Sequence, residues 1–154
     1  MAQIIHESIV AESILSEFRN QMGKTLMNNA FNTCSIEQFL SVSSVLWPSI
    51  VEVEGCLFVQ EFYNGGFEIL QEQFDGDKKK IEQFVNTWSL GEFFLMARDE
   101  SVDNDIIFDE FCKVVKFFWT LRVRQLFPNR TVIVETGDAL MGENGIAVTM
   151  YQEQ

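Results

Sequence analysis

Residues 105–127 read DIIFDEFCKVVKFFWTLRVRQLF, and TVIVE follows at residues 131–135. In the longer stretch, apolar residues recur at every third or fourth position, which is the spacing of one face of an α-helix. Phe117 and Trp119 widen this face, so we expect little of the helix to be exposed. Pro128 ends the helix, because a proline disfavours helical geometry in the residue before it. The shorter stretch is rich in β-branched residues, which predicts a strand directly after the helix.

Three further stretches have the pattern of strands. Residues 50–54 alternate apolar and acidic side chains, residues 56–62 are mostly apolar, and residues 146–151 include several β-branched side chains. Alternation with a period of two and β-branched residues are both typical of strands. The last stretch follows residues 131–135 after a glycine-rich connection. We therefore expect a hairpin to close the chain.

Helices are expected on both sides of the first two strands. Residues 3–22 place most of their apolar side chains on one side of a helical wheel, and Gly23 is expected to end this helix. Ser35 can cap a second helix, which ends before Trp47 because a proline comes next. Residues 67–74 fit either a third strand or a short helix, and we favour the helix.

Asp77 is expected to cap a further helix that runs to about Trp88. Helices come first, strands and further helices follow, and a hairpin ends the chain, which is the order of an α+β protein. No internal repeat, linker or low-complexity tract divides the sequence. The sequence therefore predicts one α+β domain over residues 1–154, with N-terminal and central helices packed on a small antiparallel sheet.

The composition is that of an acidic globular protein. The 154 residues are 47% apolar, and 23 Asp and Glu against 11 Lys and Arg give a formal net charge of −12. Such a charge serves solubility alone or attracts a basic partner. Nucleic acid and anionic membranes are not expected partners, because binding to phosphates depends on Lys and Arg. We find neither a signal peptide nor an apolar run long enough for a membrane, so we expect a cytoplasmic protein.

Residues that commonly carry catalysis are few and far apart. His6 is the single histidine, which excludes a two-histidine zinc site and leaves no recognisable nucleophile system. Cys34, Cys56 and Cys112 lack the spacing of zinc or redox motifs, and we expect three reduced thiols with the last two in the core. We therefore expect no metal, no cofactor and no enzymatic activity. A carboxylate-dependent hydrolase or metal enzyme stays an alternative, because paired carboxylates need no histidine.

Charge is distributed unevenly along the chain. Residues 52–110 contain 15 acids and 4 bases, whereas residues 111–130 contain 5 bases and no acid. One interpretation is that these bases complement the negative end of the long helix and pair with acids elsewhere. The other is that acids gather on one side of the molecule and bind a partner, through the loop 99–105 first and the connection 135–143 second. The candidate residues are Asp99, Glu100, Asp103, Asp105, Glu135, Asp138 and Glu143.

Four stretches of the chain resemble a known family. They are Trp47-Pro48, VEVEGCLF at residues 51–58, Gly76-Asp77 leading to IEQFVN at residues 81–86, and IAVTMYQ at residues 146–152. These stretches resemble small cytoplasmic immunity proteins of bacterial contact-dependent growth inhibition and related toxin systems. The resemblance implies binding to one cognate toxin domain, often a basic nuclease, whose action is thereby blocked. An adaptor subunit of a bacterial assembly is a further alternative, for which 15 Phe and 3 Trp would supply an apolar contact.

Overall fold

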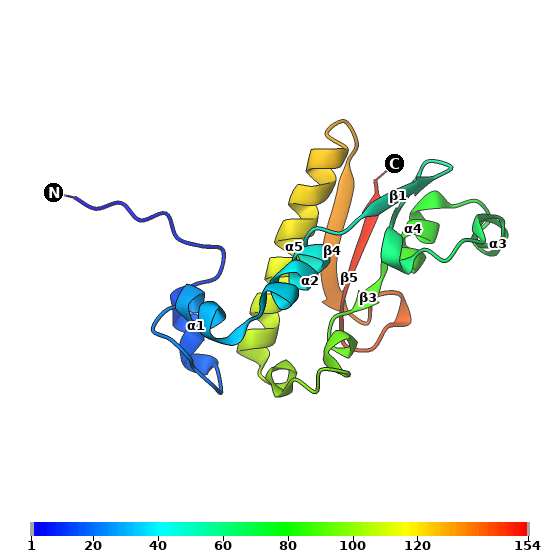
Figure 1. Cartoon of the computed structure of the whole chain (residues 1–154). Helices are drawn as coiled ribbons and strands as arrows, with labels where there is room; N and C mark the ends of the chain where they lie inside the picture. Colours follow the sequence, from blue (N-terminus) through cyan, green and yellow to red (C-terminus); the bar gives the residue numbers. More distant parts are fainter. Residues whose placement is uncertain (1, 154) are drawn as a thin grey trace.

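The chain has the expected α+β fold in a computed structural model that describes residues 2–153. The helices are α1 (Leu26–Thr33), α2 (Ile36–Leu46), α3 (Phe67–Gln73), α4 (Lys78–Asn86) and α5 (Asp105–Leu126). The strands are β1 (Ile50–Val53), β2 (Cys56–Val59), β3 (Trp88–Ser89), β4 (Val132–Asp138) and β5 (Ile146–Gln152). Short 3₁₀ helices are η1 (Glu12–Glu17), η2 (Gln60–Phe62), η3 (Glu92–Phe94), η4 (Glu100–Asp103) and η5 (Leu140–Gly142). Figure 1 shows α5 lying along the β4–β5 hairpin at the centre of the molecule.

The strands form two antiparallel sheets. In the larger sheet β5 lies between β3 and β4, and β4 pairs with β5 along the whole length of both strands. In the smaller sheet β1 and β2 are joined by Glu54 and Gly55, whose φ angles are 50° and 82°. Positive φ at both positions is what a two-residue type I′ turn requires, and its twist matches that of the flanking strands. The expected closing hairpin is confirmed.

Helix α5 packs on the larger sheet with one face. Val115, Trp119 and Val123, which follow one another at intervals of four, are at most 2% exposed and share a core with Val148 of β5. The indole N–H of Trp119 also donates a hydrogen bond to the carbonyl of Val45 in α2, at 2.9 Å. Helix α5 therefore contacts both the larger sheet and the end of α2.

Helix α4 joins the two sheets through two fully buried polar side chains, Glu82 and Asn86. The carboxylate of Glu82 accepts hydrogen bonds from the backbone N–H of Leu57 in β2, at 2.7 Å, and of Gln152 in β5, at 2.6 Å. The amide oxygen of Asn86 accepts a hydrogen bond from the backbone N–H of Val59, at 2.9 Å. Its amide nitrogen donates to the carbonyls of Leu57 in β2 and Met150 in β5. Because β2 and β5 belong to different sheets, these side chains supply the hydrogen bonds that a neighbouring strand would otherwise provide.

The N-terminal segment, residues 2–47, differs most from the sequence prediction. The helix expected over residues 3–22 is wrong: the chain is irregular there apart from η1, which buries Ile14 and Leu15. Most of a helix's stability in a protein comes from tertiary packing of its apolar face, and two buried side chains give this segment little of that packing. Helix α1 was not predicted, although Thr25 caps it by accepting a hydrogen bond from a backbone N–H.

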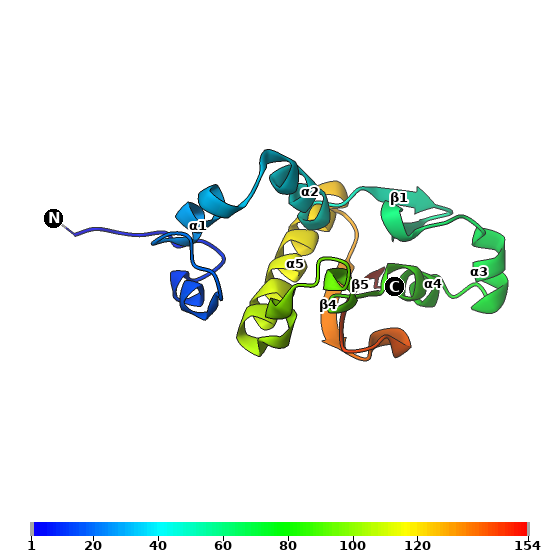
Figure 2. The ribbon, with the colours of Figure 1, turned by 60° about the horizontal axis from the view of Figure 1, so that its bottom comes forward.

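Helix α2 begins and ends where the sequence predicts. The hydroxyl of Ser35 accepts a hydrogen bond from the backbone N–H of Gln38, at 3.1 Å, and the Gln38 side chain accepts one from the backbone N–H of Ser35, at 2.8 Å. This reciprocal capping box fixes the start of the helix. Neither α1 nor α2 contains a fully buried residue. In Figures 1 and 2, α1 lies farther from the rest of the molecule than α2 does.

Several boundaries differ within the body, which we define as residues 48–153. Residues 67–73 form α3, so the favoured helix is confirmed, and Asp77 caps α4 as expected. Trp88 belongs to β3 rather than to the end of α4. The strand expected over residues 56–62 gives way to η2 after its first four residues. Phe117, which was expected to widen the buried face of α5, is 46% exposed.

Candidate protein-binding surface

The expected acidic loop at residues 99–105 is partly helical and leads into α5. Asp99 caps η4 by accepting a hydrogen bond from the backbone N–H of Ser101, at 2.9 Å. Asn104 caps α5 in the same way, accepting from the N–H of Ile106 at 3.0 Å. Asp105 then lies in the first turn of α5, where the positive end of the helix dipole stabilises a carboxylate. These caps define the backbone of the loop and leave most of its carboxylates at the surface.

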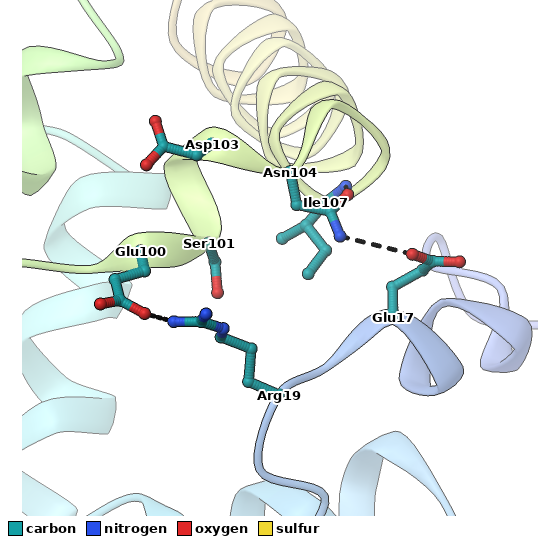
Figure 3. Close-up of a pocket in the computed structure, with 7 residues that line it drawn as sticks. All are labelled: Glu17, Arg19, Glu100, Ser101, Asp103, Asn104 and Ile107. Atoms are coloured by element: carbon teal, nitrogen blue, oxygen red, sulfur yellow. Dashed lines mark hydrogen bonds and ion pairs between the residues drawn. The ribbon is translucent and has the colours of Figure 1, made fainter.

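A small hollow of about 350 Å³ lies between this loop and η1 (Figure 3). The residues that line it are Glu17, Arg19, Glu100, Ser101, Asp103, Asn104 and Ile107. Arg19 forms an ion pair with Glu100, and Glu17 accepts a hydrogen bond from the side-chain amide of Asn104 at 3.3 Å. In Figure 3, Asp103 points away from Arg19. The hollow therefore has one cation among three carboxylates, so its surface is acidic.

The second acidic loop, residues 139–145, connects β4 to β5. It is shorter than expected because β4 continues to Asp138. The hydroxyl of Ser89 in β3 donates a hydrogen bond to the carbonyl of Asn144, at 2.9 Å, which anchors the loop to the larger sheet. Asp138 is exposed and Glu143 is half-buried. The loop itself contains one acid, Glu143, and Asp138 is the last residue of β4, so the larger sheet anchors the backbone on which both acids lie.

Both acidic loops lie at the same end of the molecule. Helix α5 and β4 follow each other after a short turn and pack side by side, so the start of α5 and the end of β4 lie at the same end. Figures 1 and 2 both show the segment before α5 and the β4–β5 connection there. We call this surface the acidic end; its members are Asp99, Glu100, Asp103, Asp105, Asp138 and Glu143. Within residues 2–153, Glu100 is the member of this set that has an ion-pair partner.

The five bases of residues 111–130 lie along α5 and shortly after it. Arg122 donates a hydrogen bond to the carbonyl of Pro48, at 3.1 Å, and Arg130 after the helix pairs with Glu52 of β1, at 2.8 Å. Some of the bases in residues 111–130 thus have a structural role, as expected if they pair with acids elsewhere in the fold. A helix of 22 residues is about 33 Å long, several times the Debye length of about 8 Å at physiological ionic strength. Bases near the end of α5 therefore screen the acidic end only weakly.

Glu135 lies apart from the other candidates. It is in β4, three residues before the strand ends, and is paired in register with Thr149 of β5. Its half-buried carboxylate accepts a hydrogen bond from the hydroxyl of Tyr151, at 3.3 Å. Burial and the nearby Glu135 carboxylate raise the pKa of Tyr151, so this hydroxyl stays protonated. Glu135 was expected where the strand 131–135 meets the connection 135–143, and it lies within β4 because that strand continues for three more residues.

A second hollow, of about 760 Å³, was not predicted from the sequence. It lies between α2, η2 and β3, and its aromatic walls are Phe62, Tyr63, Trp88, Phe93 and Trp119. The indole rings of Trp88 and Trp119 stack with their centroids 6.3 Å apart. Serine, glutamine and glutamate side chains add polar groups to its lining. Its volume is within the range of small-molecule sites, and its residues come from segments too far apart for a sequence motif to indicate it.

The three cysteines are free thiols; Cys34 is exposed, and Cys56 and Cys112 are buried as expected. Burial raises the pKa of both buried thiols to about 11, and nearby carboxylates add to the shift. Among the residues that the structure describes, no group of three or more His, Cys, Asp or Glu is arranged to hold a metal ion. Over the same range, no helix is both long and apolar enough to cross a membrane.

The chain was compared with protein-family models, with curated proteins and with solved structures, and none of them matches it. The resemblance to immunity proteins therefore stays a prediction. What the protein does has to be inferred from its own residues, above all from those of the acidic end and from the exposed N-terminal helices.

Proposed function

We propose that the protein is an immunity protein that binds a basic toxin domain through its acidic end and blocks the toxin's active site. The observation that carries this proposal is that six carboxylates, from two segments more than thirty residues apart in the sequence, lie at the same end of the molecule. Like charges brought together repel one another, and the one ion pair among them, between Glu100 and Arg19, is largely exposed and therefore weak. Such an arrangement is best accounted for by a cationic partner.

The proposed mechanism is occlusion assisted by electrostatic attraction. An enzyme that acts on nucleic acid carries Lys and Arg where it receives phosphates. Carboxylates of the acidic end would take the place of those phosphates and cover the site. The net charge of −12 has the same sign, so the field of the whole molecule steers a basic partner toward it. Occlusion requires no chemistry, so we expect the protein to have no catalytic activity of its own.

The resemblance in four stretches of sequence supports the same class of protein. A cytoplasmic location belongs to this proposal, because an immunity protein must meet an incoming toxin inside the cell. A carboxylate-dependent hydrolase is the alternative that the same acids allow. That alternative predicts a turnover that disappears when a single carboxylate is changed.

The proposal is tested by titrating toxin activity. The neighbouring reading frames are first searched for a toxin domain; that domain is then mixed with increasing amounts of the purified protein, and we expect activity to be lost at equal molar amounts. The variant Asp103→Lys with Asp138→Lys should inhibit much less well, because it reverses two exposed charges of the acidic end.

Glu68→Lys with Glu72→Lys is the matched control. These two acids of α3 are exposed and lie away from the acidic end, and their reversal gives the same net charge. The control should inhibit as the unchanged protein does. Equal loss in both variants would attribute the effect to total charge alone, and a toxin that stays active with the unchanged protein would overturn the proposal.

A further inference from the structure

Helices α1 and α2 leave a large apolar surface uncovered. Six of their side chains are between 45% and 79% exposed: Met27, Phe31, Ile36, Phe39, Leu40 and Val42. Neither helix buries a residue, and α2 contacts α5 near its end, where Val45 and Leu46 are half-buried. Soluble monomers rarely expose a connected apolar surface larger than a few hundred Å². Met27 and Phe31 share one side of α1, and Ile36, Phe39 and Leu40 share one side of α2, whereas Val42 lies two positions from Leu40 and points to the other side. We define the α1–α2 face by the first five of these residues, and we expect a partner to cover it.

We propose that the α1–α2 face docks against the same face of a second copy of this chain. The area agrees with such an interface. At about 200 Å² for each residue, the exposed fractions of the five leave about 650 Å² on each copy, which is within the range of about 600–1,000 Å² that each partner contributes to a standard interface. Pairing one face with itself gives a closed two-fold dimer, which is the commonest oligomer of soluble proteins.

Charge also favours a second copy over a basic toxin domain. Between residues 20 and 51 the only charged side chains are Lys24 and Glu37, so this stretch has no net charge. Two copies, each with a net charge of −12, repel one another least where they approach through a neutral surface. A basic partner, by contrast, finds no excess of acids there. The α1–α2 face and the acidic end thus differ in the chemistry of the partner that each one fits.

The dimer is tested by sedimentation velocity on the full chain without any partner. We expect a monomer–dimer equilibrium with a Kd in the micromolar range or tighter, which is usual for interfaces of this size. Phe31→Glu with Leu40→Glu should raise Kd by about 100-fold, because it places charges in a buried apolar contact. Both side chains are largely exposed in the monomer, so the variant should keep its circular dichroism spectrum and thermal midpoint.

Ile69→Glu with Met96→Glu is the matched control, since these body residues are 69% and 94% exposed and the added charge is the same. The control should dimerise as the unchanged chain does. Hydrogen exchange should show that residues 26–46 become protected only at concentrations where the dimer forms. Hydrogen exchange thus locates the dimer interface in the unchanged chain, without any substitution.

Three outcomes would overturn the proposal. They are an unchanged chain that stays monomeric at about 100 µM, a dimer that survives Phe31→Glu with Leu40→Glu, and equal dissociation in the control. A monomer whose toxin binding is lost in the same double variant would instead assign the face to the toxin. Because the dimer is measured without toxin, its failure leaves the proposed immunity function untouched.

Discussion

The N-terminal segment and the body have similar shares of apolar side chains but place them differently. In the body, α5 and the larger sheet enclose Trp119 and the valines beside it. In the N-terminal segment, Ile14 and Leu15 are the fully buried apolar side chains within residues 2–47, and α1 and α2 expose most of theirs. The same residue types thus form a core in one region and a surface in the other.

This difference shows what determines a helix in this chain. Residues 3–22 place most of their apolar side chains on one side of a helical wheel, as α4 does, yet of the two only α4 packs on strands. Helix formation in proteins depends mainly on tertiary packing of the apolar face. Where that packing is slight, a helix persists with a local cap, as α1 does at Thr25, or does not form at all.

The largest expected effect comes from removing the central side chain of the body. Trp119→Ala should lower the free energy of unfolding by about 3–5 kcal/mol, because it creates a cavity and removes the hydrogen bond to Val45. Phe31→Ala removes a ring that is 70% exposed and should change the free energy by less than about 0.5 kcal/mol. Urea unfolding at concentrations that keep the chain monomeric measures both. Similar losses in the two variants would remove the distinction between the regions.

A smaller but still large effect is expected where α4 joins the sheets. Glu82→Ala leaves the N–H groups of Leu57 and Gln152 unpaired, and each buried unpaired group costs about 1–3 kcal/mol. The total loss for the two groups should be about 2–6 kcal/mol. Glu7→Ala, an exposed acid of the N-terminal segment, is the control and should stay within about 0.5 kcal/mol. A Glu82→Ala variant as stable as the control would show that the junction does not depend on this carboxylate.

The three thiols should also react at different rates in the N-terminal segment and in the body. A thiol reagent at pH 8 should modify Cys34 of the N-terminal segment rapidly. Cys56 and Cys112 should react at least about 100-fold more slowly, because they are buried and a pKa of about 11 leaves little thiolate. Mass spectrometry after timed quenching gives the three rates. Rapid modification of Cys112 in the folded protein would show that the core around α5 opens readily.

The same raised pKa values predict a dependence of stability on pH. Folding raises the pKa of Cys56 and Cys112 from 9.0 to about 11, so the folded state holds these protons more tightly than the unfolded state. The stabilisation is therefore complete below pH 9 and is lost as the pH rises toward 11. Urea unfolding across this range should show the decline. Changing both cysteines to alanine should flatten it, and an unchanged slope would assign it to other groups.

Much of the fold could be predicted from residues close together in the sequence. The capping box at Ser35, the cap at Asp77 and the spacing of α5 each depend on neighbours within a few positions. The end of α4 and the long strand β4 could not be placed so well, because long-range pairing decides them. Trp88 leaves the helix to pair with Val148, and β4 continues as far as its pairing with β5 does.

The candidate site was predicted less completely than the fold. The acids at residues 99–105 and Asp138 are visible as a local excess of charge, and topology then brings them to one end. The ion pair between Arg19 and Glu100 joins residues 81 positions apart, and no local pattern indicates it. The structural role of Glu82 could not be predicted from the sequence either, because nothing distinguishes one buried carboxylate among the many acids of this chain.

The central claim is that the acidic end captures a basic toxin domain, and its most direct test is the salt dependence of association. The toxin domain is immobilised, and association and dissociation rates are measured from about 50 mM to about 500 mM NaCl. Long-range attraction is screened over this range, so association should slow by about tenfold or more while dissociation changes little. Asp103→Lys with Asp138→Lys should slow association at low salt and weaken its salt dependence, whereas Glu68→Lys with Glu72→Lys should leave both nearly unchanged. Rates independent of ionic strength, together with full tolerance of charge reversal at the acidic end, would contradict the claim.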